Sequence, residues 1–109
     1  MYNHMEHKIF AVDFDGTLCE NAWPEIGEPN VAMIEYVKAL RQKGHKIILW
    51  TCREGNDLLK AISWCAEQGL IFDAVNDNLE DTKEWFGGNS RKIVAHYYID
   101  DRALPALPF

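Results

Sequence analysis

The amino-acid sequence predicts an α/β domain built around a parallel sheet. Short apolar runs alternate with longer stretches of helical periodicity, in the order strand, helix, strand, helix, strand, connection, strand. Strands and helices that alternate in this way are joined by right-handed crossovers, which set the strands parallel in one sheet. Three of the runs stop at polar side chains, and parallel strands bring such ends together at one edge.

The composition is typical of a single globular domain, which we expect to span residues 1–109 with a core over about residues 8–102. The formal charge of −6 argues against general nucleic-acid binding and against binding to acidic membranes. Three irregularly spaced cysteines indicate free thiols rather than a disulfide framework. The sequence has no run near the roughly 20 apolar residues of a membrane span and no apolar signal core, so we expect a cytoplasmic location without membrane association.

The first strand is predicted over about residues 8–13, an apolar run that stops at Asp13 and Asp15. Gly16 supplies the backbone freedom for a sharp exit from this strand. Residues 19–29 contain two prolines and a glycine, too many breakers for a long helix. We expect them to form an irregular loop or a small flap beside the two carboxylates.

A helix is predicted over residues 30–43, ended by Gly44. Its apolar stripe consists of Val31, Ile34, Val37 and Leu40. The second strand, residues 47–50, is another continuous apolar run and stops at Thr51. Both elements fit the alternation of strand and helix that the fold class requires.

Asn56 is the predicted N-cap of a second helix, which ends at Gly69. Its inward side chains are expected to be Leu58, Leu59, Ile62 and Cys65. Residues 70–75 follow as a short third strand. The pattern therefore repeats the strand–helix unit once more before the polar connection begins.

The remaining chain holds a polar connection and a last strand. The connection, residues 76–88, is expected to contain a helical turn near residues 81–86. The fourth strand is predicted over residues 93–99 and stops at Asp100-Asp101. Residues 103–109 contain two prolines and are expected to lie extended on the domain.

Four carboxylates are expected to meet at the carboxyl edge of the sheet: Asp13, Asp15, Asp100 and Asp101. Carboxylates a few ångströms apart repel one another unless a proton or a cation compensates them. Ligands that are all oxygen atoms favour a hard ion. The sequence therefore predicts a Mg²⁺ site rather than a zinc site.

Thr51, Arg53 and Lys92 add donors for an anion beside that ion. Lys92 precedes the last strand, so it starts at the opposite edge unless the loop before it returns its side chain. Carboxylates, Mg²⁺, a hydroxyl and an ammonium together suit phosphoryl transfer, in which one carboxylate attacks phosphorus and another moves protons. The alternatives are that Thr51 caps the following segment, that Arg53 is solvated, and that Arg91 takes the place of Lys92.

These residues, in this order, resemble the four motifs of the haloacid dehalogenase (HAD) superfamily of phosphohydrolases. The matching stretches are Asp13-Phe14-Asp15-Gly16-Thr17-Leu18, the apolar run into Thr51, then Lys92, and Tyr97-Tyr98-Ile99-Asp100-Asp101. The resemblance runs from about residue 8 to residue 102. It implies a three-layer, Rossmann-like parallel sheet flanked by helices and an aspartyl-phosphate mechanism.

The resemblance also implies a role for each residue. Asp13 would be the nucleophile and Asp15 the general acid/base. Thr51 and Lys92 would bind the phosphoryl group, with Lys92 delivered to the site from its helix or loop. Mg²⁺ would be held by Asp13, the backbone carbonyl of Asp15, and Asp100 or Asp101.

The chain has little room for a cap domain of the usual kind. Residues 16–50, 35 in number, separate Asp15 from Thr51, and one helix uses most of them. Residues 76–91, 16 in number, separate Val75 from Lys92. The resemblance therefore implies a small capless member, whose open site is covered at most by the flap, a partner subunit or a large substrate.

The function predicted from the sequence is a Mg²⁺-dependent phosphatase that hydrolyses a phosphate monoester through an aspartyl-phosphate on Asp13. The alternatives are a phosphotransferase of the same mechanism and a non-catalytic phosphoryl-binding or regulatory module similar to receiver domains. Receivers carry paired acids at the first strand, whereas here the paired acids come last, which favours the enzyme. The expected partner is a phosphorylated small molecule or polymer end, and an open site is compatible with an oligomer.

Overall fold

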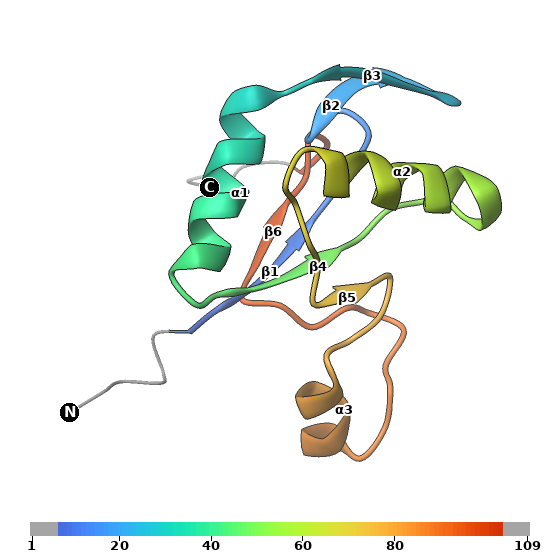
Figure 1. Ribbon diagram of the computed structural model, residues 1–109. Coiled ribbons are helices and arrows are strands. Elements are labelled where there is room, and N and C mark those ends of the chain that lie inside the picture. The colour runs from blue at the N-terminus through green and yellow to red at the C-terminus, as the bar shows by residue number, and fades with distance from the viewer. Residues whose placement is uncertain (1–6, 104–109) are drawn as a thin grey trace, which may run out of the picture.

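Four parallel strands form the central sheet of the computed structural model, which describes residues 7–103 (Figure 1). They are β1 (Ile9–Val12), β4 (Lys46–Leu49), β5 (Ala74–Val75) and β6 (Tyr97–Ile99). Their order across the sheet is β5-β4-β1-β6, and every pairing is parallel. Ala11 in β1 lies opposite Ile48 on one side and Tyr98 on the other. The predicted α/β class with a parallel sheet is confirmed, and it is compatible with a Rossmann-like fold.

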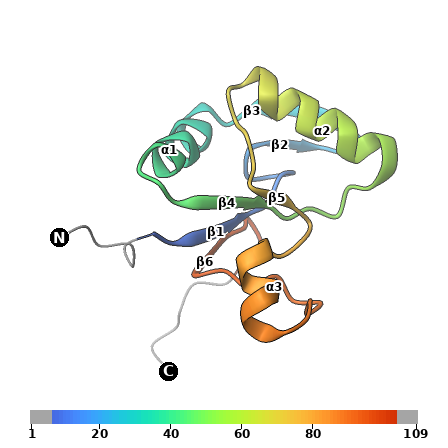
Figure 2. The same ribbon diagram turned by 60° about the horizontal axis from the view of Figure 1, so that its bottom comes forward.

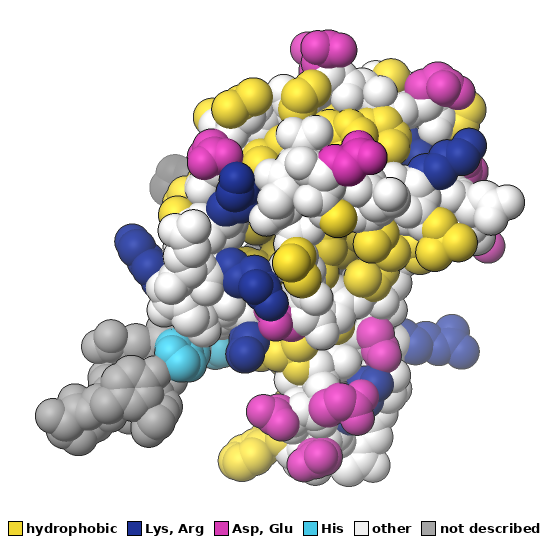
Figure 3. Space-filling view, viewed as in Figure 1, with side chains coloured by type: hydrophobic (Ala, Val, Ile, Leu, Met, Phe, Trp, Pro, Cys, Tyr) yellow, Lys and Arg dark blue, Asp and Glu magenta, His cyan; other side chains and the backbone are white. Residues whose placement is uncertain are grey.

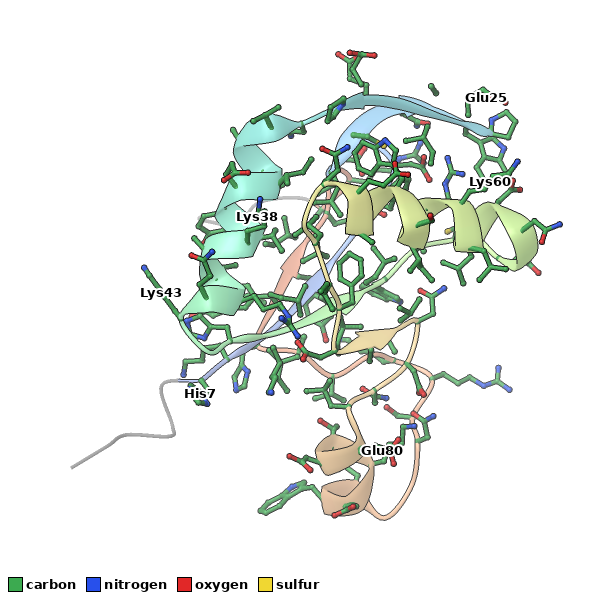
Figure 4. The ribbon with its side chains drawn as sticks, viewed as in Figure 1. His7, Glu25, Lys38, Lys43, Lys60 and Glu80 are labelled. Carbon is green, nitrogen blue, oxygen red and sulfur yellow. The ribbon has the colours of Figure 1, made fainter. Side chains whose placement is uncertain are left out.

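Helices flank the sheet, and a β-hairpin stands beside two of them. One side carries α1 (Val31–Gln42), α2 (Gly55–Glu67) and the antiparallel hairpin of β2 (Cys19–Ala22) and β3 (Glu25–Pro29). α3 (Glu80–Phe86) lies on the other side, as Figures 1 and 2 show. Figure 3 shows acidic side chains gathered over α3, and Figure 4 marks the hairpin by Glu25 and α2 by Lys60.

The strand β1 contributes to two cores. Phe10 and Val12 belong to the larger cluster, which buries the inner faces of α1 and α2 against the sheet. Ala11 belongs to a smaller cluster with Ile48 and Ile93 on the opposite face. Successive residues of a strand point to opposite faces, so a sheet covered on both sides requires the continuous apolar runs found in the sequence.

Two predicted core residues are exposed instead. Val31 is 62% exposed because it is the first residue of α1, one turn before Ile34, where burial begins. Leu59 is 64% exposed, since a helix turns about 100° per residue and the preceding Leu58 already faces the core. The other stripe residues named from the sequence are buried or packed against the core: Ile34, Val37, Leu40, Leu58, Ile62 and Cys65.

The helix starts agree with the sequence prediction for α1, and for α3 to within one residue of the expected turn near residues 81–86. The N-cap of α1 is Asn30, the residue at which the predicted range begins. There, Asn30 Oδ1 accepts the N–H of Met33 at 3.3 Å, as an N-cap does. The prediction of Asn56 as the N-cap of α2 is wrong, because α2 begins at Gly55 after Glu54. The N-cap position of α2 is Glu54, two residues before the predicted Asn56.

The strands β5 and β6 begin at Ala74 and Tyr97, later than the predicted residues 70 and 93, and at the residue just before each start a side chain takes the place of a strand carbonyl as acceptor. Ile47 donates its N–H to Asp73 Oδ2 at 2.8 Å, and Ile9 donates its N–H to His96 Nδ1 at 2.8 Å. These side chains occupy donors that a longer strand would pair with its carbonyls. The regular ladders therefore begin only at the next residue.

Residues 19–29 form an antiparallel hairpin whose register shifts between Cys19 and Asn21. Of the two expected forms, the small flap is consistent with this hairpin, and the irregular loop is wrong because most of the segment is paired strand. Gly27 is required by close packing: a Cβ at this position would lie 2.2 Å from the carbonyl oxygen of Glu20 on the paired strand. The peptide bond between Trp23 and Pro24, at the turn of the hairpin, is cis. The hairpin thus presents its turn beside the loop that follows β1.

Some expectations concern the whole chain. Apart from Ala103, the predicted extended tail lies outside the described residues. Within residues 7–103, no helix is both long and apolar enough to cross a membrane. The cytoplasmic location, the single domain over 1–109 and the oligomeric state stay predictions.

Candidate functional site

The acidic residues lie where the order of the strands reverses. From β1 the chain continues to β4 and β5 on one side, then returns to the other side of β1 for β6. Ligands of open parallel sheets bind at the carboxyl ends of the strands beside such a reversal. Backbone bonds continue the sheet there, since Asp13 N–H donates to Ile99 O and Trp50 N–H to Val12 O, both at 2.9 Å. The residues after β1, β4 and β6 therefore leave the same edge.

Three carboxylates converge at this edge. Oxygen atoms of Asp13, Asp100 and Asp101 lie within 4.8 Å of one another. Thr17, which is buried, links the two loops that carry them. Its Oγ1 donates to Asp13 Oδ2 at 3.0 Å and accepts the backbone N–H of Asp101 at 3.1 Å. One hydroxyl thus fixes the β1 loop against the β6 loop.

Gly16 allows Asp101 to approach this closely. The residue has φ +87°, a conformation that favours glycine, and a Cβ on it would lie 2.3 Å from Asp101 Oδ2. Any side chain at position 16 would have to displace the carboxylate. The glycine of the sequence signature therefore serves the packing of the site as well as the turn.

Crowding perturbs the protonation of Asp13. Burial raises the pKa of Asp13 from 3.8 to about 6, and the hydrogen bond with Asp101 and the charge of Asp100 act in the same direction. The hydrogen bond from Thr17 opposes them. The surroundings of Asp13 therefore disfavour its charged form.

Asp15 has a different environment. Both of its carboxylate oxygens accept from Arg53, Oδ2 from Nε and Oδ1 from Nη2, each at 2.8 Å. This is the bidentate geometry that makes arginine–carboxylate pairs strong and directional. The structure thus separates Asp15 from the three grouped carboxylates, and its side chain is not one of the cation ligands that lie within 4.8 Å.

Arg53 is 1% exposed, so the solvated alternative is wrong. Four of its five N–H donors are already used, two on Asp15 and one each on the carbonyl oxygens of Pro24 and Glu25. The hydrogen bonds with Asp15 raise the pKa of Arg53 above its ordinary value. Its geometry is that of a structural clamp, which leaves little of the guanidinium for a phosphate.

Thr51 is held at the edge by a residue that the sequence prediction missed. Asn76 Oδ1 accepts the Thr51 N–H at 2.7 Å, from a left-handed backbone position with φ 50°. Thr51 Oγ1 accepts the N–H of Arg53 at 3.1 Å, which is the capping contact of the alternative interpretation. A hydroxyl that accepts there can still donate its own hydrogen to a ligand.

Lys92 is the predicted site residue that the structure does not bring to the carboxylates. Its side chain is exposed, with Nζ 5.7 Å from the centroid of the Tyr98 ring. That ring lies 5.4 Å from the ring of Trp50, the neighbour of Thr51. The competing Arg91 is exposed as well. The loop places Lys92 on the aromatic pair beside the edge, outside the cavity described next.

Six of the seven predicted site residues line one cavity of about 420 Å³: Asp13, Asp15, Thr51, Arg53, Asp100 and Asp101. Trp23 from the hairpin, 57% exposed, and Arg102 also line it. A larger hollow of about 670 Å³ runs beside α1 and β6 and has no carboxylate in its wall. We therefore take the smaller cavity as the candidate site, because the carboxylates line it and the larger hollow has none.

The donor set fits a hard divalent cation. Asp13, Asp100 and Asp101 offer oxygen ligands only, and oxygen ligands suit Mg²⁺. In the part of the chain that the structure describes, none of the three forms an ion pair with a lysine or arginine. Such a group of acids is costly without compensation, which a cation would supply.

Fold and site together define an α/β protein with an acidic cavity at the carboxyl edge of a parallel sheet. No family model and no curated protein matches the chain. A solved structure, described as a conserved protein coded by a locus from Bacteroides thetaiotaomicron, is 43% identical, with a TM-score of 0.81 over 94% of this chain and 83% of that one. The chain belongs to the same family as this Bacteroides protein. That description gives no activity, so function is argued from the site.

Proposed function

We propose that the protein is a Mg²⁺-dependent phosphatase that forms an aspartyl-phosphate on Asp13, as a small capless member of the HAD superfamily. The observation that carries the proposal is the convergence of Asp13, Asp100 and Asp101 within 4.8 Å at the strand reversal. Asp15 lies on the wall of the same cavity, two residues from the nucleophile. This combination supplies a nucleophile, a proton carrier and a cation site around one space.

In the first step a carboxylate oxygen of Asp13 attacks phosphorus, and the bond from phosphorus to the leaving oxygen breaks. Asp15 gives that oxygen a proton. In the second step Asp15 takes a proton from water, whose oxygen attacks phosphorus and releases Asp13 and inorganic phosphate. Thr51 would donate its hydroxyl hydrogen to a phosphoryl oxygen.

Asp13, Asp100 and Asp101 would hold the cation, which when bound offsets the negative charge of the phosphate. The raised pKa of Asp13, about 6, leaves it ionised, and therefore nucleophilic, at neutral and higher pH. Lys92, whose side chain is exposed on the Tyr98 ring, would add an ammonium only by leaving that ring for the cavity.

The connections support a capless protein within the described residues. Between β1 and α1 the chain forms only the hairpin, and between β5 and β6 only α3 and irregular backbone. A site without a cap would admit a phosphorylated small molecule or the phosphorylated end of a polymer. The hairpin, with Trp23 in the cavity wall, would then be its nearest cover.

The test is hydrolysis of an aryl phosphate and of a panel of sugar phosphates, nucleotides and phosphorylated polymer ends, with Mg²⁺ or with EDTA. We expect Mg²⁺-dependent phosphate release that Asp13→Asn abolishes. Asp15→Asn should form an acyl-phosphate from a good leaving group and then retain it. The matched control is Asp81→Asn, which changes an exposed carboxylate of α3 outside the cavity.

Other outcomes select between the remaining functions. A wild-type protein that turns over no ester yet keeps a stable acyl-phosphate is a regulatory module. Transfer of the phosphoryl group to an added alcohol in preference to water identifies a phosphotransferase. Rapid dephosphorylation of the Asp15→Asn variant removes Asp15 from the proton-transfer role.

A further inference from the structure

Arg53 is the most unusual buried side chain of the described residues. It is 1% exposed and is the largest side chain that is almost fully buried. Burial of an ion pair is weak evidence for added stability, because well-packed apolar residues of similar volume often replace such pairs without loss. Added stability is therefore a weak explanation for an arginine buried in the cavity wall, and its contacts indicate another role.

The contacts of Arg53 run in two directions. Toward the sheet, Nε and Nη2 bind both oxygens of Asp15 at 2.8 Å. Toward the hairpin, Nη1 donates to the carbonyl oxygen of Pro24 at 3.1 Å and Nη2 to that of Glu25 at 2.9 Å. Glu25, at the start of β3, is labelled on the hairpin in Figure 4.

Aromatic rings complete the environment of the guanidinium. The ring of Phe14, directly between Asp13 and Asp15 in the chain, has its centroid 5.2 Å from Arg53 Cζ. The ring of Trp23, at the hairpin turn, has its centroid 5.0 Å away. Each side of the clamp thus combines hydrogen bonds with a cation–π contact. The planar fork of arginine can make these contacts together, and an ammonium cannot.

We propose that Arg53 is a positioning residue that ties the β2–β3 hairpin to Asp15. One guanidinium aims the acid/base carboxylate and holds the hairpin turn closed against the cavity. The aiming of Asp15 rests on the proposed phosphatase function, whereas the anchoring of the hairpin does not. The two parts can be measured separately.

The three cysteines provide the measurement of the hairpin. Cys52 is exposed and lines the cavity, Cys19 is buried at the base of the hairpin, and Cys65 is buried in α2. The thiols of Cys19 and Cys65 are both buried; burial raises the pKa of Cys19 and raises that of Cys65 to about 12, so we expect both to react slowly in the folded protein. Because Cys19 also packs in the larger core cluster with Cys65, alkylation of Cys19 without alkylation of Cys65 reports opening of the hairpin, and alkylation of both reports unfolding of the core.

The variants are Arg53→Met, Arg53→Lys and Arg53→Ala, with Arg41→Met as matched control because Arg41, which is 41% exposed, also pairs with an aspartate, Asp73, but lies outside the cavity. With Arg53→Met we expect Cys19 alkylation to rise at least about tenfold while Cys65 stays at its wild-type rate. We expect kcat to fall about 100-fold with KM within about threefold, the pattern of a misplaced catalytic group. Arg53→Lys should recover only part of both effects, and added guanidinium should restore kcat in Arg53→Ala.

Each contrary result has a defined meaning. Cys19 alkylation at the wild-type rate in Arg53→Met overturns the anchoring. An unchanged kcat, or a loss confined to KM, overturns the aiming of Asp15. Cys65 exposed together with Cys19 in both Arg53→Met and Arg53→Lys makes Arg53 a general stability residue and overturns the proposal. If the wild-type protein hydrolyses no ester, the phosphatase function fails, and the alkylation rates alone decide the anchoring.

Discussion

Replacing Asp13 by Asn should stabilise the metal-free protein at neutral pH while abolishing the proposed activity. The folded protein raises the pKa of Asp13 from 3.8 to about 6, so the protonated carboxyl favours the folded state. That contribution is complete below pH 3.8 and is lost as the pH rises through about 6. Asn resembles the protonated form in shape, can accept the hydroxyl of Thr17 and can donate to Asp101.

The magnitude follows from the shift. A difference of roughly 2 units between the folded and unfolded pKa of Asp13 corresponds to roughly 3 kcal/mol of unfolding free energy. Asp13 is only half-buried, and solvent screening reduces the expected effect to about 1–2 kcal/mol. For a domain of this size, that is an increase of about 5–10 °C in Tm.

The assay is urea or thermal unfolding of wild type and Asp13→Asn in EDTA, at pH 4 and pH 7.5. We expect equal stabilities at pH 4 and the variant to be more stable at pH 7.5. Added Mg²⁺ should narrow the gap at pH 7.5 by stabilising the wild type. A variant that is equally or less stable than the wild type at pH 7.5 would refute the argument that crowded acids strain this edge.

Three further changes test the geometry of the same edge. Gly16→Ala should lower the free energy of unfolding by about 1–3 kcal/mol, because Gly16 has a positive φ and an added Cβ would meet Asp101. The same change should reduce the free energy of Mg²⁺ binding, measured by calorimetry, by more than it reduces the free energy of unfolding. Thr17→Val should lower the free energy of unfolding in urea by about 1–3 kcal/mol, because the Asp101 N–H loses its acceptor. It should also shift the acid limb of the activity profile to higher pH, since the Thr17 hydroxyl lowers the pKa of Asp13. Thr17→Ser should restore both the stability and the pH profile. Mg²⁺ at 100 times its Kd should stabilise the wild type by about 2.7 kcal/mol in thermal unfolding, and Asp101→Asn should lose most of that gain.

The strand runs and the polar residues that end them could be predicted from the sequence because both are local features. The run before Asp13 and the run before Thr51 are continuous in the chain, and the rule for parallel strands places their ends together. The grouping of Asp13 with Asp100 and Asp101 follows from this rule. The start of α1 after Asn30 is equally local, since the cap and its acceptor lie three residues apart.

The contacts that sequence reasoning missed are made by side chains distant in the chain. Arg53 binds Asp15 across 38 positions, and nothing near Arg53 signals that partner. Asp73 and His96 replace strand carbonyls through side-chain acceptors just before β5 and β6 begin, without changing the apolar pattern of these strands. Lys92 depends on the path of an irregular loop, and no periodic pattern describes such a path.

The hydroxyl of Thr17 joins two loops whose residues, Thr17 and Asp101, are 84 positions apart. A ribosome must therefore release the chain as far as Asp101 before the acidic edge can assemble, because β6 follows the other three strands of the sheet along the chain. Until then β1 keeps one unpaired side, and the carboxylates of Asp100 and Asp101 are absent from it. A cation that requires acids from both loops would bind only after this docking and would shift the equilibrium toward it by mass action. Cation binding at this edge would thus occur only when β6 has paired with β1 and the sheet is complete.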